Sequence, residues 1–115
     1  MSDLNEIRDL LRQFVAEREW DQFHSPKNLA MALSVEAAEL LEHFQWLTPE
    51  QSSNLPPEKV KQVAQEMSDV LVYLIRLSDK LDINLITEAK EKLILNAEKY
   101  PADLVRGSAK KYTEY

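Results

Sequence analysis

Residues 34–46 read SVEAAELLEHFQW, and residues 66–73 read EMSDVLVY. Each segment carries an acid, two small or apolar residues, a second acid and then two aliphatic residues. Residues three apart on a helix project about 60° from each other, so each pair of acids shares one side of its helix. Glu36 and Glu39 border the apolar side of the first segment, as Glu66 and Asp69 border that of the second. Two helices packed along these sides would direct four carboxylates to one point.

Converging carboxylates repel each other and resist burial unless a positive charge lies among them. Ligand sets made only of oxygen favour Mg²⁺ or Mn²⁺ over zinc, which prefers His or Cys. A di-iron bundle needs Glu-x-x-His pairs, but the residues three after Glu39 and Glu66 are Glu42 and Asp69. The sequence therefore predicts a Mg²⁺ site, with Mn²⁺ as a possible substitute, whose ligands are Glu36, Glu39, Glu66 and Asp69. Glu42 lies far round the helix from the apolar side and is expected to be an ordinary surface acid.

The composition limits the remaining function classes. The chain has 115 residues with 30% charged and 44% hydrophobic side chains, which is typical of one globular domain. The formal net charge of −6 argues against binding to polymeric nucleic acid. There is no Cys, no apolar run long enough for a bilayer and no basic leader, so we expect a cytoplasmic protein without membrane contact. The single glycine, Gly107, excludes a Gly-rich phosphate loop, so metal and side chains must handle any phosphate.

Helical spacing of apolar residues accounts for most of the chain. It predicts long helices over residues 3–17, 26–47, 57–81 and 85–100, with a short helical turn after Thr48. Pro26 and Pro57 suit the first turns of two of these helices, and Pro101 ends the last one. No strand pattern competes, so the predicted fold is an all-α bundle of four principal helices, with an apolar buried side on the helix over residues 57–81. We expect one domain over residues 1–115, with an ordered core at about 3–101 and a polar tail at 102–115.

Aromatic residues lie where three separate segments approach the acids. Trp20, Phe23 and His24 precede the second helix, Trp46 ends it, and Tyr73 follows Asp69 by one turn. Aromatic faces are suited to stacking on a nucleobase, and hydrogen-bonding groups such as Gln22 and His24 could select its identity. The competing interpretation is that Trp20, Phe23 and Trp46 fill the core. Lys92 and Asn96 share one face of the last helix, where they are either substrate ligands or part of a solvated charged stripe.

These motifs, taken together, resemble a known family. The relevant segments are EREWDQFH at 17–24, PKNL at 26–29, FQW at 44–46, EMSDVLVY at 66–73, YP at 100–101 and KKYTE at 110–114. They resemble the all-α nucleoside triphosphate pyrophosphohydrolases of the MazG-like superfamily, and most closely its dCTP pyrophosphatase branch. The similarity spans nearly the whole chain, and its W-x-Q-F-H and F-Q-W parts are specific.

The resemblance implies Mg²⁺-dependent hydrolysis of a nucleoside triphosphate to the monophosphate and pyrophosphate. It also implies a homo-oligomer, typically a tetramer, with active sites between subunits. The four acids would be the metal ligands, and Lys92 and Asn96 would match a recurring Lys and Asn of the last helix. The residues implied to line the nucleoside pocket are Trp20, Asp21, Gln22, Phe23, His24, Trp46 and Tyr73. The chain departs from the family at Leu11, near which dCTP-specific relatives can carry a histidine.

The function expected from these features is hydrolysis of a dNTP at its α-phosphorus, with dCTP or a modified dCTP as the preferred substrate. Glu36 or Glu39 would position or deprotonate the attacking water. The role would be to cleanse the nucleotide pool. One alternative is a pyrophosphohydrolase of broad specificity or directed at dUTP. The other is a noncatalytic helical interaction module that uses an acidic groove.

Overall fold

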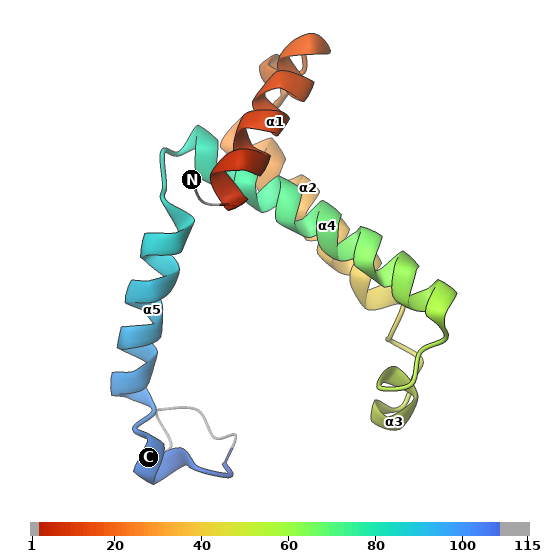
Figure 1. Ribbon diagram of the computed structural model, residues 1–115, viewed down its shortest axis with the longest axis vertical. Helices are drawn as coiled ribbons and strands as arrows, with labels where there is room; N and C mark the ends of the chain where they lie inside the picture. Colours follow the sequence, from red (N-terminus) through yellow and green to blue (C-terminus); the bar gives the residue numbers. More distant parts are fainter. Residues whose placement is uncertain (1–2, 109–115) are drawn as a thin grey trace. The chain divides into compact units, whose positions relative to one another are not determined.

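The computed structural model describes residues 3–108, which form helices and no strand (Figure 1). The elements are α1 (Asp3–Glu17), the 3₁₀ turn η1 (Asp21–Phe23), α2 (Pro26–Glu42), α3 (Pro49–Ser52), α4 (Pro57–Lys80), α5 (Leu85–Lys99) and α6 (Ala102–Val105). Four of the helices are long, so the all-α prediction with four principal helices is confirmed. Among the helices of residues 3–108, none combines the length and apolar character needed to cross a membrane.

Local capping groups determine where the helices begin. The Ser25 hydroxyl accepts a hydrogen bond from the Asn28 backbone N–H, and Pro26 occupies the first turn of α2. Thr48 and Gln51 form a complete capping box at α3, and the Asn84 side chain caps α5. These groups satisfy backbone N–H donors that have no partner inside the helix. The predicted starts of α1, α2, α4 and α5 agree with the structure because their determinants lie within a few residues.

The structure differs from the prediction in two places, at the end of α2 and after Pro101. α2 ends at Glu42, although the apolar spacing continued to Leu47. From His43 onward, backbone bonds of the i to i−3 type tighten the chain into turns, and Pro49 disfavours a helical Thr48. The short helix α6 lies in the region expected to be a polar tail, directly after Pro101. Residues 109–115 of that predicted tail lie outside the described residues.

The chain divides into two compact units, Met1–Asp82 and Ile83–Tyr115. In the first unit α4 packs against both α2 and α1, and α2 runs antiparallel beside α4 (Figure 1). The second unit contains α5 and α6. The single domain over residues 1–115 stays a prediction.

The apolar core within residues 3–108 is small. Its buried members are Val15 of α1, Leu29 of α2, and Val63 and Ile75 of α4. The predicted buried side of α4 is only partly covered, because Val60 and Met67 on that side are 51% and 56% exposed. This expectation was therefore wrong for an isolated chain, in which α1 and α2 are too few to cover the whole apolar surface of α4.

Leu29 should be the most sensitive apolar position of α2, because it is only 1% exposed. We expect Leu29→Ala to lower the free energy of unfolding by about 2–5 kcal/mol, through lost burial and the cavity left behind. Urea unfolding followed by circular dichroism measures this change. Lys27→Ala on the same helix, whose side chain is exposed, is the control and should change stability by less than about 0.5 kcal/mol. Equal effects of the two substitutions would contradict the burial of Leu29.

Candidate functional site

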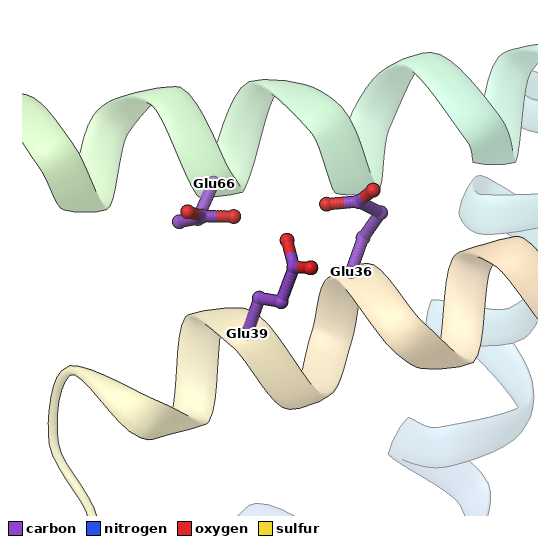
Figure 2. Close-up of side chains that lie close together, drawn as sticks. All are labelled: Glu36, Glu39 and Glu66. Carbon is purple, nitrogen blue, oxygen red and sulfur yellow. The ribbon is translucent and has the colours of Figure 1, made fainter.

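Three of the four predicted metal ligands meet between α2 and α4. Glu36 and Glu39 project from α2 towards α4, and Glu66 projects from α4 towards α2 (Figure 2). One carboxylate oxygen from each residue lies within 4.8 Å of the other two. Spacing along each helix puts these acids on one side, and the antiparallel packing of α2 on α4 brings the two sides together. The structure thus brings together three of the four acids that were predicted to converge.

The electrostatics of the cluster show an uncompensated negative site. The Oε2 atoms of Glu36 and Glu66 are buried and have no hydrogen-bond partner among the described residues. Burial raises the pKa of Glu36 to about 7, with further contributions from Glu39, which also hydrogen-bonds it, and from Asp69 and Glu66. A buried carboxylate oxygen without a partner is costly unless a cation or a proton compensates it. The donor set is oxygen only, so these residues fit a hard divalent cation such as Mg²⁺ or Mn²⁺.

Asp69 contributes to the site less directly than the other three acids. Its side chain is exposed, and it is not among the three residues that meet within 4.8 Å. Its negative charge nevertheless helps to raise the pKa of Glu36, so it acts on the same site. Glu42 is exposed, as expected for a surface acid.

His43 adds a residue to the site that sequence reasoning missed. Its Nε2 atom lies 3.8 Å from Oε1 of Glu66, and both side chains are mostly buried. The signal was present, because His43 follows Glu36 by two helical turns and so lies on the same face.

The predicted base-binding loop precedes α2 and has its own supports. Gln22 donates a side-chain hydrogen bond to the Glu19 carbonyl, and Asn28 donates one to the Phe23 carbonyl. The ring of Trp20 meets that of Phe14 edge-on, with centroids 5.8 Å apart, and Trp20 stays 45% exposed. The loop therefore has a defined shape while its large side chains remain accessible.

The aromatic candidates do not fill the core of this chain, because Phe23 and Trp46 are 60% and 86% exposed. They are also not gathered at one point. Trp20 precedes α2 and Trp46 follows it, and the helix between them is about 26 Å long at 1.5 Å per residue. Tyr73 is half-buried on α4, one turn beyond Asp69. One copy of the chain therefore does not bring Trp20 and Trp46 together.

Lys92 and Asn96 lie on α5, in the second unit of the chain. Lys92 is exposed and Asn96 is half-buried. Their spacing of four residues places them on one face of α5, as predicted. The acids, by contrast, belong to α2 and α4 of the first unit.

Comparison with known proteins decides the family. The sequence profile of the MazG-like family matches residues 31–115, which include all four acids. The chain belongs to the MazG-like family. The resemblance noted in the sequence is thereby confirmed.

Several named proteins are similar to this MazG-like chain. It is 42% identical over 113 residues to dCTP pyrophosphatase 1 of Homo sapiens and of Mus musculus. The matched region covers 96% of this chain and 66% of each relative, so the chain spans just under two thirds of their length. Among solved structures, a pyrophosphatase from Archaeoglobus fulgidus DSM 4304 matches with a TM-score of 0.83 and 40% identity. That match covers 88% of this chain and 94% of the archaeal chain.

The raised pKa of Glu36 predicts how the stability of the metal-free protein depends on pH. The folded protein holds a proton on Glu36 up to about pH 7, whereas the unfolded chain releases it near the ordinary value of 4.5. The contribution of Glu36 to the free energy of unfolding should therefore be highest below about pH 4.5 and should be lost as the pH rises to about 7. Glu36→Gln should weaken this fall, as measured by thermal unfolding with chelator between pH 5 and 8. An unchanged slope in the variant would contradict the assignment.

Proposed function

We propose that this chain is a Mg²⁺-dependent pyrophosphohydrolase that converts a dNTP to the dNMP and pyrophosphate, with dCTP or a modified dCTP preferred. The observation that carries the proposal is the cluster of Glu36, Glu39 and Glu66, in which two buried carboxylate oxygens have no hydrogen-bond partner within the described part of the chain. Membership of the MazG-like family and the names of the relatives support the same reaction. The proposed role is removal of unwanted nucleotides from the cytoplasmic pool, by one domain spanning residues 1–115.

The mechanism assigns separate tasks to the acids. Glu36, Glu39, Glu66 and Asp69 would hold the cation, whose positive charge offsets the charge that develops on the phosphate oxygens. Glu36 or Glu39 would orient a water molecule towards the α-phosphorus and accept its proton. The water oxygen bonds to the α-phosphorus as the bond to the bridging oxygen breaks, and pyrophosphate leaves.

The loop residues Trp20 to His24, together with Trp46 and Tyr73, would receive the nucleoside. An aromatic face gives a base about 1–3 kcal/mol of stacking without choosing its identity, so the choice falls to polar groups such as Gln22 and His24. Lys92 and Asn96 would contribute a cation and an amide to the substrate from α5. Because Trp20 and Trp46 lie at opposite ends of α2, they could enclose one base only if two copies of the chain contribute.

We propose further that the protein is a homo-oligomer, a tetramer, with active sites shared between subunits. Met31 and Val35 of α2 and Met67 of α4 are each more than half exposed, although they are apolar. Large apolar surfaces left exposed on one chain are typical of sites that contact another protein. A second copy would cover these faces and, in the same step, complete the aromatic pocket.

A pyrophosphohydrolase of broader specificity, or one directed at dUTP, is the second candidate. Leu11, in α1, favours it, because this side chain offers no hydrogen bond with which to select cytosine. A panel of dNTPs separates the two candidates, and a protein that turns over none of them would be a noncatalytic helical module.

The metal ligands can be tested with a control on the same helix. We expect Glu39→Gln or Asp69→Asn to reduce Mg²⁺-dependent release of pyrophosphate from dCTP by at least about a hundredfold while the helical circular dichroism is retained. Glu42→Gln removes an exposed acid one turn from Glu39 and should keep near wild-type activity. Release of orthophosphate instead of pyrophosphate, or full activity in Glu39→Gln, would refute the proposal.

The assembly can be tested by static light scattering at micromolar concentration. We expect a mass of about four times the 13.3 kDa of one chain. Met31→Lys should lower this mass by placing a charge in the proposed interface, with helix content maintained. A wild-type mass of 13.3 kDa would contradict both the tetramer and the shared pocket.

A further inference from the structure

Arg76 of α4 is a buried cation that none of the metal and base-binding assignments uses. Its side chain is 5% exposed, and it lies two helical turns beyond Asp69, or about 10 Å along α4. A buried guanidinium is stable only when its charge and its N–H donors are matched by partners. The identity of these partners therefore indicates what the residue does.

Two of the three partners of Arg76 belong to the loop before α2. Its Nη2 atom donates to Oδ1 of Asp21 at 3.0 Å, and its Nε atom donates to Nδ1 of His24 at 3.3 Å. The third partner is Asp79 on the next turn of α4, at 3.6 Å from Nη1. Arg76 thus joins α4, which carries Glu66 and Asp69, to the first residue of the turn Asp21–Phe23 and to His24, the residue after that turn.

Asp21 and Asp79 each pair with a second cation, whereas His24 pairs with Arg76 alone among the described residues. Lys80 also reaches Asp21, at 2.9 Å, and Arg12 of α1 forms a two-pronged ion pair with Asp79. Each acid would therefore keep a cation if Arg76 were changed. No other hydrogen bond is given to the His24 ring by the described residues.

The bond to His24 defines the protonation of its ring. Arginine can only donate, so Nδ1 of His24 must accept and carries no proton. Burial and the charge of Arg76 lower the pKa of His24, with Lys80 acting in the same direction and Asp21 opposing, and this favours the neutral ring. A neutral imidazole without a proton on Nδ1 carries it on Nε2, so His24 presents an N–H donor on its free side.

We propose that Arg76 is a positioning residue for base selection: it orients His24 as an Nε2–H donor towards the acceptor atoms of a cytosine ring. The inference rests on the proposed function, since it concerns the base of the dNTP. Cytosine carries acceptors at N3 and O2, whereas uracil and thymine carry an N–H donor at N3. A fixed Nε2–H donor facing N3 can hydrogen-bond to cytosine. With uracil, the same donor would face the N3–H donor of the base, and polar sites reject substrates that leave such groups unpaired.

The tautomer can be measured without any enzymatic reaction. The chain has two histidines, His24 and His43, so ¹⁵N spectra of the imidazole rings are simple, and His24→Gln assigns the signals. We expect His24 at pH 7 to show an unprotonated Nδ1 and a protonated Nε2. A proton on Nδ1, or a cationic ring, would overturn the proposal.

Kinetics then separate a role in base selection from a purely structural one. Arg76→Lys keeps the positive charge but loses the Nε–H donor. It should raise KM for dCTP about tenfold, which corresponds to the loss of one hydrogen bond. The ratio of kcat/KM for dCTP to kcat/KM for dUTP should fall by a similar factor. The kcat for dCTP should stay within about twofold. Arg12→Lys is the matched control, because Arg12 pairs with the same Asp79 but does not touch the loop. It should lower the Tm and leave KM and the base ratio unchanged.

Asp21→Asn provides a second variant if Arg76→Lys does not fold. The Asp21 side chain is 64% exposed, so the substitution is tolerated in folding while it weakens the loop's bond to Arg76. It should shift the base ratio in the same direction. The positioning role would be overturned if the ratio of kcat/KM for dCTP and dUTP did not change in whichever of Arg76→Lys and Asp21→Asn folds. It would also be overturned if Arg12→Lys shifted this ratio equally. If the wild type hydrolysed no dNTP, the proposed function would fail, and the imidazole spectrum would still decide the state of His24.

Discussion

Repulsion among Glu36, Glu39 and Glu66 is the constraint on which the rest of the first unit depends. The three carboxylates meet between α2 and α4, and two of their oxygens are buried without a hydrogen-bond partner among residues 3–108. Such an arrangement opposes the packing of the very helices that carry it. The contacts that hold the helices together are few, with Leu29, Val63 and Ile75 buried. Such a cluster does not add to the stability of the metal-free chain, and this supports the proposal that it binds a cation.

The distribution of cations along α4 supports the interpretation that Glu36, Glu39 and Glu66 form a cation site. Asp21 and Asp79, near the end of the helix, are paired with Arg76, Lys80 and Arg12. Among residues 3–108, no Lys or Arg forms an ion pair with Glu36, Glu39 or Glu66, and Nε2 of His43 lies 3.8 Å from Oε1 of Glu66. Within the described residues, the acids near one end of α4 are therefore compensated by cations of the chain itself, whereas the acids between α2 and α4 are not. This difference supports the proposed cation site, because a structural ion-pair network is compensated by its own members.

The sequence predicts those features whose causes are local. Capping residues such as Ser25 and Asn84, the prolines and the spacing of three between acids all act within a few residues. The helix starts and the convergence of three of the four acids could therefore be predicted. The end of α2 could not, since apolar spacing continues past the point where the backbone turns. Arg76 could not be recognised either, because a single basic residue in a helix gives no indication that a loop about fifty residues earlier will surround it. The exposure of Met67 could not be predicted for a related reason. Helical periodicity identifies an apolar face, but it does not show whether another part of the same chain covers that face.

The small core has a consequence for how the protein comes to be folded. If α2 and α4 complete their apolar contacts only against a second copy, folding and association are one kinetic process, and its rate depends on protein concentration. A newly made chain at low abundance would then remain with Met31 and Met67 in water for longer, in a state open to proteolysis and to nonspecific association. The amount of active protein would rise more steeply than the amount of chain synthesised, so a change in expression would be amplified at the level of the assembled protein.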